Sequence, residues 1–274
     1  MNAASPSYRV AVAGLGAIGQ AVAHALDSGS IPGCRLAAVS GRDPGKTQDF
    51  VAALSTAVPM AALEDLGAHA DVIVECLPPA LLSAVADPAL RAGKTVVVLS
   101  AGALLRYPEL IDLAAGHAGA RILVPSGAAL GLDAVAAAAE GRIESARMIT
   151  RKPPAGFKGA PLVVERNIDL DQLTEPVLLF EGTAREAARD FPSNLNVAVA
   201  FSLAGIGPDR TRLEVWADPG ISRNTHALEV VSDSSVLRMT IENIPSANPK
   251  SSRITALSVI ALLRKLAAPL NVGT

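Results

Sequence analysis

The chain has 274 residues, of which 50% are hydrophobic and 3% aromatic, and its formal net charge is −2. This length favours two domains of moderate size, with enough apolar residues to bury a sizeable core. The scarcity of aromatic side chains argues against a base-stacking nucleic-acid surface. No basic or acidic block stands out, so neither a nucleic-acid nor a membrane partner is suggested.

The cellular compartment is suggested by the cysteines and by the first residues. Cys34 and Cys76 are far apart and lack CxxC spacing, which fits a reducing compartment better than a disulfide framework. The segment formed by residues 1–7 is short and polar and lacks the basic-then-apolar pattern of a signal peptide. Gly, Pro or charged residues interrupt every apolar stretch before about 18 residues, too short for a membrane span. We therefore expect a soluble cytoplasmic protein.

In the first half of the chain, apolar runs alternate with segments that have helical character. We predict strands at 8–13, 35–40, 71–77, 95–99 and 121–124, and helices at 18–28, 47–54, 80–92 and 109–116. The strands are continuous apolar runs, as is typical of a parallel sheet covered on both faces. The fold class is therefore α/β, with an N-terminal Rossmann-type parallel sheet.

The pattern changes after about residue 127, where strands with alternating polarity become common. We predict strands at 146–151, 178–182, 212–218, 225–232 and 236–243, and helices at 133–140, 183–190, 194–204 and 252–266. Such strands predict a second α/β domain with an open, mostly antiparallel sheet. We expect residues 1–126, joined by a C-terminal segment at 245–274, to form the dinucleotide-binding domain. Residues 127–244 would then form the catalytic, substrate and dimerisation domain.

The first predicted strand ends in the sequence GLGAIG, which has the GxGxxG spacing. Gly14 permits a tight turn, Gly16 lets the backbone approach a pyrophosphate, and Gly19 allows close packing of helix and strand. Ala17 and Ile18 lie in the helix start, whose amides favour an anion. A purely structural Gly-rich turn is the alternative. The position after an apolar strand and before a run of βα units favours a bound dinucleotide.

The turn after the second strand bears on the choice of cofactor. An acidic residue there holds the ribose of NAD, whereas an Arg favours the 2′-phosphate of NADP. Ser40 and Arg42 suit a 2′-phosphate, and Asp43 comes one or two positions late for a ribose contact. We predict that NADP is accepted and that NAD is not excluded. Arg42 as a solvated loop cation is the alternative.

Two further turns follow later strands of the same sheet, and ligands bind at the carboxyl ends of such strands. They contain Cys76, Leu77 and Pro78, and Ser100, Ala101 and Gly102. Both are predicted to line the cofactor, the second nearer the nicotinamide, although either is also compatible with a plain turn.

His226 is the candidate for proton transfer among the four histidines of the chain. It begins a predicted strand of the second domain, and a His suits proton transfer coupled to hydride transfer. A structural role is the alternative for a lone histidine. The other three lie in a helix or in connections away from the predicted ligand edge, where structural or solvated roles are expected.

Two polar segments are candidates for substrate contacts. Asn194 and Asn196 open an apolar helix, either as an amide pair directed at the nicotinamide or substrate, or as helix caps. Lys250, Ser251 and Ser252 precede the final helix and suit a carboxylate, although a charged loop with a capping Ser is also possible. Neither a metal-binding motif nor a GxSxG nucleophile turn is present, so no metal is predicted.

The chain contains, in order, the motifs GLGAIG, ECLPP, SAGAL, VPSGA with GLDA, FPSNLNVA, NTH, NIPSANPKSS and a terminal NVGT. With these motifs the chain resembles the L-aspartate dehydrogenase family over nearly its whole length. The resemblance implies NAD(P)-dependent oxidative deamination of L-aspartate through iminoaspartate to oxaloacetate and ammonia, and the reverse amination. It also implies a Rossmann domain with a second α/β domain, usually in a dimer.

The resemblance assigns roles to three residues. His226 matches the active-site histidine, and Ala128 and Asn196 match cofactor contacts. In the expected mechanism, hydride leaves the aspartate Cα for nicotinamide C4, and His226 takes a proton from the amino group or from water. Lys250, Ser251 and the neighbouring backbone would hold substrate carboxylates. In relatives, iminoaspartate can feed NAD biosynthesis.

Two other functions remain open at this point. One is another reductase of the same architecture, similar to dihydrodipicolinate reductase or homoserine dehydrogenase. The other is a non-catalytic protein that binds NAD(P)H to report redox state; it would bind the cofactor without turning over any amino or oxo acid.

Overall fold

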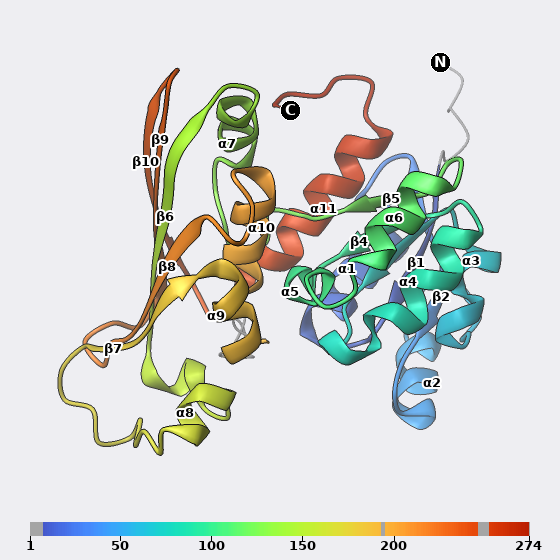
Figure 1. Ribbon diagram of the computed structural model, residues 1–274. Helices are drawn as coiled ribbons and strands as arrows, with labels where there is room; N and C mark the ends of the chain where they lie inside the picture. Colours follow the sequence, from blue (N-terminus) through green and yellow to red (C-terminus); the bar gives the residue numbers. More distant parts are fainter. Residues whose placement is uncertain (1–7, 193–194, 246–251, 274) are drawn as a thin grey trace. The chain divides into compact units, whose positions relative to one another are not determined.

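The computed structural model describes residues 8–192, 195–245 and 252–273, which fall into two compact units (Figure 1). The first unit comprises residues 1–125 and 256–271, and the second comprises 126–255 and 272–274. We expected the C-terminal return to the first domain to begin at residue 245. Of the described residues in this segment, 245 and 252–255 group with the second unit and 256–271 with the first, and Pro245 and Ser252 form an isolated β-bridge.

The first unit is built on a five-stranded sheet in the order β2-β1-β3-β4-β5, in which every neighbouring pair is parallel. Its strands are β1 (Tyr8–Ala13), β2 (Cys34–Ser40), β3 (Val72–Glu75), β4 (Thr95–Val98) and β5 (Arg121–Leu123). The central strands are buried along nearly their whole length, which explains their continuous apolar runs. This arrangement confirms the predicted parallel sheet.

A one-residue strand lies beyond β2. Val39 forms a parallel bridge with Met60, supported by hydrogen bonds from Val39 N to Pro59 O (3.1 Å) and from Ala61 N to Val39 O (3.0 Å). Counting this bridge as a shortened strand gives the Rossmann order 3-2-1-4-5-6. The order reverses between β1 and β3, so the predicted ligand crevice lies at the carboxyl ends of these two strands.

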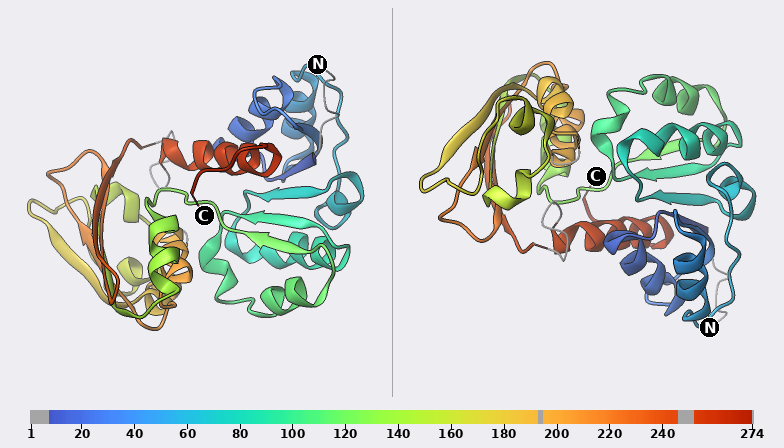
Figure 2. Two further views of the ribbon diagram at one scale, coloured as in Figure 1. Left: turned by 90° about the horizontal axis from the view of Figure 1, so that it is seen from above. Right: turned by 90° about the horizontal axis from the view of Figure 1, so that it is seen from below.

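Helices cover both faces of this sheet (Figure 2). One face carries α1 (Ala17–Asp27), α2 (Pro44–Ala52) and α11 (Arg253–Ala267), and the other carries η1 (Leu63–Asp65), α3 (Leu66–His69), α4 (Leu82–Arg91) and α6 (Glu109–Gly116). Val259 and Leu263 of α11 are buried among the valines of β1, and the Cys34 thiol donates to Leu263 O. Among the described residues, no helix is long and apolar enough to cross a membrane.

The second unit contains a five-stranded sheet in the order β10-β9-β6-β8-β7. Its strands are β6 (Ile143–Lys152), β7 (Val177–Thr183), β8 (Thr211–Ala217), β9 (Asn224–Ser232) and β10 (Val236–Asn243). The pairing is antiparallel except between β6 and β8, which are parallel. The predicted mostly antiparallel sheet is confirmed, and the parallel pair makes it mixed.

Helices pack on one face of this second sheet (Figure 1). They are α7 (Leu132–Ala139), α9 (Ala184–Asp190) and α10 (Asn196–Ala204), together with η3 (Pro154–Phe157) and α8 (Pro161–Glu165) near its lower end. Phe157, Phe191 and Phe201 fill the space between sheet and helices. The other face carries charged pairs such as Arg238 with Glu229, which explains the alternating polarity of these strands.

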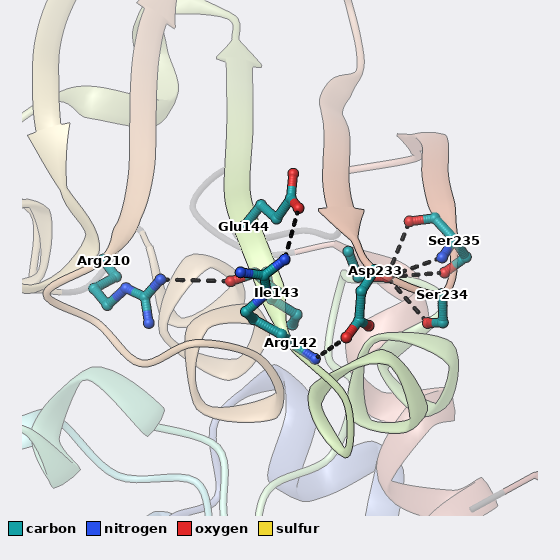
Figure 3. Close-up of polar contacts among 8 residues, drawn as sticks. Arg142, Ile143, Glu144, Arg210, Asp233, Ser234 and Ser235 are labelled. Carbon is teal, nitrogen blue, oxygen red and sulfur yellow. Dashed lines mark hydrogen bonds and ion pairs between the residues drawn. The ribbon is translucent and has the colours of Figure 1, made fainter.

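A polar cluster lies at one end of the second sheet, where β6, β9 and β10 meet (Figure 3). The Arg142 amide donates to the Asp233 carboxylate (3.1 Å), and the Asp233 amide donates to Arg142 O (3.0 Å). Ser232 and Ser235 close the hairpin between β9 and β10 through backbone and hydroxyl bonds. A slip of one residue would turn every inward side chain outward, so these contacts are compatible with one register only.

Candidate functional site

The turn after β1 lies against the turn after β3. Gly14 has a φ of +94°, and a Cβ at this position would meet Cys76 O at 2.5 Å. The Gly14 amide also donates to Ser40 O (2.8 Å), which ties the turn to the end of β2. Only glycine fits this left-handed and crowded position. Three strand ends therefore meet at the point where the strand order reverses.

The start of α1 has the features of a phosphate-binding site. Gly16 is the N-cap of α1 and is exposed, and a Cβ added there would have no atom within 4 Å. Gly19 packs so closely against Gly14 O that it admits no side chain. Because Gly16 has no side chain to cap the helix, the first amides of α1, around exposed Ala17 and half-buried Ile18, receive no side-chain cap. The residues present therefore fit a dinucleotide pyrophosphate.

In the turn after β2, the Asp43 side chain caps the following helix. The Asp43 carboxylate accepts a hydrogen bond from Lys46 N (3.1 Å) and caps α2. Ser40 is buried at the end of β2, whereas Arg42 is exposed. A side chain at Gly41 would collide with Thr47. Arg42 and Asp43 are both exposed, and of the two only Asp43 serves as the cap of α2.

Glu75, which the sequence analysis did not single out, joins the ends of β3 and β4. Its carboxylate is fully buried and accepts hydrogen bonds from Leu77 N (2.7 Å), Leu99 N (3.1 Å), Ser100 N (3.0 Å) and Ser100 Oγ (2.7 Å). Burial raises the pKa of Glu75, while the bonds from these donors act in the opposite direction. The carboxylate holds the two predicted cofactor turns together.

The hydrogen bonds to Glu75 limit which groups of the two turns can contact a ligand. The Ser100 hydroxyl is committed to Glu75, and Ala101 and Gly102 are buried. Burial, with a further contribution from Glu75, raises the pKa of the Cys76 thiol far above its usual range, so the thiol stays protonated. Cys76 and Leu77 are half-buried and Pro78 is exposed. The predicted cofactor residues therefore contribute shape and backbone groups rather than reactive side chains.

A polar end of the second sheet contains His226. Along β9 the inward residues are Asn224, His226, Leu228 and Val230, so the buried face changes from apolar to polar toward the start of the strand. His226 pairs with Thr150 of β6 in the sheet register, and Thr150 Oγ1 lies 3.2 Å from His226 Nδ1. Both side chains are at most 1% exposed.

Lys152 ends the inward series of β6, and the sequence analysis did not single it out either. It is 3% exposed, and its ammonium lies 5.9 Å from the centre of the Phe157 ring. Burial lowers the pKa of Lys152 to about 8. Burial, with a further contribution from the positive charge of Lys152, lowers the pKa of His226 to about 3. The imidazole is therefore neutral at physiological pH.

Two amide side chains hold loops at the same polar end. Asn224 Nδ2 donates to the Ser252 hydroxyl (3.3 Å), and both residues are buried. Asn243, which pairs with Asn224 in the sheet, donates through Nδ2 to Ala128 O (3.1 Å). Ala128 and Ser252 are thus anchored by neighbouring strand residues.

The remaining predicted site residues are placed as follows. Asn196 is the first residue of α10, whose N-cap, Leu195, makes no side-chain capping bond, and it is half-buried. Asn194, Lys250 and Ser251 lie outside the described residues.

Each unit therefore carries its own group of candidate residues. The first unit gathers the turns after β1, β2, β3 and β4, and the second gathers Thr150, Lys152, Asn224, His226 and Ser252. Two other histidines have local partners, His24 with the Phe50 ring and His117 with Leu113 O. Within the described ranges, no group of three or more His, Cys, Asp or Glu residues is placed to hold a metal ion.

Family models match both units. Residues 14–125 match the model described as the NAD binding domain of homoserine dehydrogenase. Residues 133–266 match the model described as the C-terminal domain of aspartate dehydrogenase. The first match covers the glycine turn and the braced strand ends, and the second covers His226 and Lys152.

Named relatives match the chain from end to end. It is 65% identical to L-aspartate dehydrogenase 3 of Bordetella bronchiseptica, over 97% of each chain. It is 56% identical to L-aspartate dehydrogenase of Bradyrhizobium diazoefficiens, over 99% of this chain and 96% of the relative. The crystal structure of aspartate dehydrogenase from Thermotoga maritima shares the fold, with a TM-score of 0.71, 22% identity, and coverage of 97% of this chain and 99% of that one. These findings confirm the resemblance drawn from the motifs, and the chain belongs to the L-aspartate dehydrogenase family.

Proposed function

We propose that this chain catalyses the NAD(P)-dependent oxidative deamination of L-aspartate to oxaloacetate and ammonia, and the reverse reductive amination. The observation that carries the proposal is a buried, neutral histidine beside a buried lysine, in a chain with 65% identity to a named L-aspartate dehydrogenase. Deamination breaks the substrate Cα–H bond, and its electron pair leaves as hydride. The nitrogen loses a proton as the C=N bond forms, and water then releases ammonia.

His226 is the proposed proton acceptor. Its Nδ1 lies beside the Thr150 hydroxyl, which leaves Nε2 as the ring nitrogen for the substrate or for the attacking water. The tautomer that suits this role carries its proton on Nδ1 and donates it to Thr150. A histidine with a raised pKa would be protonated already, so the lowered pKa keeps the lone pair available.

The first unit is the proposed cofactor domain. Gly14, Gly16, Ala17, Ile18 and Gly19 cradle the pyrophosphate. When bound, the nicotinamide supplies the hydride acceptor for deamination and the hydride donor for amination. Ser40 with exposed Arg42 favours acceptance of NADP as well as NAD. The turns around Cys76, Leu77 and Pro78, and around Ser100, Ala101 and Gly102, line the rest of the cofactor.

The second unit is the proposed catalytic, substrate and dimerisation domain. Ala128 and Asn196 contact the cofactor, and Asn194, Asn196, Lys250, Ser251 and Ser252 contact the substrate. The support for Ser252 and Ala128 is that buried Asn224 and Asn243 fix their positions. We further propose a cytoplasmic homodimer whose iminoaspartate feeds NAD biosynthesis. Sedimentation analysis of the purified chain tests the dimer.

The deciding experiment assays oxaloacetate plus ammonia with NADH and NADPH in parallel, following loss of the reduced cofactor by absorbance. We expect turnover with both cofactors. Dihydrodipicolinate with the reduced cofactors, and homoserine with NAD+ or NADP+ while gain of the reduced cofactor is followed, serve as competing substrates. Preferential turnover of either would favour a different reductase. Cofactor binding without turnover of any amino or oxo acid would favour a redox sensor and overturn the proposed activity.

A further inference from the structure

Lys152 stands out among the buried charged residues of the second unit. The inward side chains of β6 are Ala146, Met148, Thr150 and Lys152, so this strand ends its buried face with an ammonium group. Arg151, the preceding residue, has its guanidinium over the Trp216 ring at 4.6 Å, and its position alternates with that of Lys152 along the strand. Two adjacent cations therefore occupy different faces, and only Lys152 joins His226 on the buried face.

The charged surroundings of Lys152 come from several elements. His226 faces it from β9, and Asp218 follows the end of β8, where its amide donates to Lys152 O (2.9 Å). The Asp218 carboxylate accepts from Gly220 N (2.9 Å) and lies 3.6 Å from the Arg151 guanidinium. Phe157 of η3 contributes an aromatic face.

Burying an ammonium group costs several kcal/mol, so a buried lysine is seldom kept for packing alone. A dianionic substrate supplies two carboxylates, and a lysine at this position offers a fixed positive charge for one of them. His226 lies on the same face, so a carboxylate on Lys152 would place the amino-bearing carbon near the imidazole.

We propose that Lys152 binds a carboxylate of the dicarboxylate substrate and thereby orients it toward His226. The inference rests on the proposed function and deepens it, because it assigns the binding of a substrate carboxylate to a residue of β6. Carboxylate binding also has a consequence for His226. The Lys152 charge contributes to the lowered pKa of His226, and an anion on Lys152 offsets that charge. The imidazole becomes a stronger base when the substrate is in place.

The test measures binding rather than turnover. L-malate is a suitable probe because it is a dicarboxylate without an amine, and its carboxyl groups are ionised above about pH 6. Calorimetric titration of L-malate into the NADH-loaded protein is compared for the wild type, Lys152→Met and Lys152→Arg. Lys158→Met is the matched control, because Lys158 is an exposed lysine of the same unit that pairs with Asp171.

We expect Lys152→Met to weaken L-malate binding at least about 30-fold, the loss typical of a buried charge-assisted hydrogen bond. Lys158→Met should bind like the wild type, and all variants should keep their NADH affinity. Wild-type affinity should fall as the pH rises through about 8, where Lys152 loses its proton. Lys152→Arg stays charged, so its L-malate affinity should remain flat over this range.

Unchanged L-malate binding by folded Lys152→Met would overturn the inference. So would a Lys152→Arg variant that loses affinity with pH as the wild type does, and this comparison still decides the question if Lys152→Met does not fold. This test and the activity assay can fail independently. If the wild type binds L-malate through Lys152 but does not turn over aspartate, the carboxylate-binding role stands and the proposed activity is wrong.

Discussion

His226 combines burial, a neutral ring and a fixed Nδ1 contact, and these three properties predict a large effect of its removal. We expect His226→Ala to lower kcat about 100-fold or more, since general acid–base catalysis typically contributes at least this factor. NADH affinity should stay within about twofold, because the glycine turn belongs to the other unit. Steady-state kinetics and NADH fluorescence titration measure the two quantities. His117→Ala is the control, and equal kcat values for the two variants would remove His226 from the mechanism.

Burial of the Lys152 ammonium is expected to lower the free energy of unfolding, while the same charge favours substrate binding. Its pKa is about 8 in the folded chain and 10.5 in the reference state, so the unfolded chain binds the proton more tightly. Below about pH 8 the folded state holds the protonated ammonium, whose burial lowers the pKa. As the pH rises from about 8 to about 10.5, the folded state becomes more stable, because only the unfolded state still holds the proton.

The substitution Lys152→Met should therefore raise the free energy of unfolding at pH 7, by up to about 3 kcal/mol. The advantage of the variant should shrink as the pH rises through the window above. Urea denaturation at pH 7 and at pH 10 measures both differences. A variant less stable than the wild type at pH 7 would mean that Lys152 contributes to the fold, against this prediction.

At the scale of elements, Glu75 connects two turns that a parallel sheet leaves as separate loops. Glu75→Gln keeps the size of the side chain but places an NH₂ group where backbone and hydroxyl donors now converge. We expect a loss of about 2 to 4 kcal/mol in the free energy of unfolding and weaker NADH binding. Chemical denaturation and NADH fluorescence measure the two effects. Glu64→Gln, at an exposed position, is the control. Unaltered NADH affinity in Glu75→Gln would show that the cofactor turns do not need the hydrogen bonds to Glu75.

The elements were predictable wherever a local pattern specifies them. The runs of β3 and β4 and the alternating β10 have such patterns, and their predicted bounds agree closely with the structure. Short elements were missed: η3 and α8 begin at prolines in an irregular stretch, and the strand at Met60 is a single bridge that exists only through its pairing with β2. A pattern needs several residues, and these elements offer too few.

At the scale of the whole molecule, the same distinction separates the predicted site residues from the missed ones. Gly14, Gly16 and Gly19 act through a local turn, and their spacing is visible in the sequence. Lys152 becomes notable only because β6 pairs with β9 and brings Thr150 opposite His226, 76 positions away. Glu75 gains its role through Ser100, 25 positions away. Sheet register supplies these relations, and no local pattern encodes it.

The chain returns to its first unit after completing the second, through α11. From this path we predict that cofactor binding depends on the last helix. Val259 and Leu263 of α11 are fully buried in the apolar cluster that also contains residues of β1, β2 and α1, whereas Leu257 on the same helix is 60% exposed. A charge at Leu263 would be buried without a partner in this cluster, which includes Val10 and Val12 of the strand that leads into the glycine turn. We expect Leu263→Asp to cost about 3 to 5 kcal/mol of stability and to reduce NADH binding, although every residue of the glycine turn is retained.

Leu257→Asp provides the matched control, since it places the same charge on the exposed side of α11 and should leave melting temperature and NADH affinity nearly unchanged. Thermal denaturation with and without NADH separates two explanations for any loss in Leu263→Asp. If the helix supports the sheet, saturating NADH recovers part of the lost melting temperature, because the ligand binds only the folded unit. If Leu263→Asp binds NADH as tightly as Leu257→Asp does, the first unit forms its cofactor site without α11, and the dependence argued from the chain path is wrong.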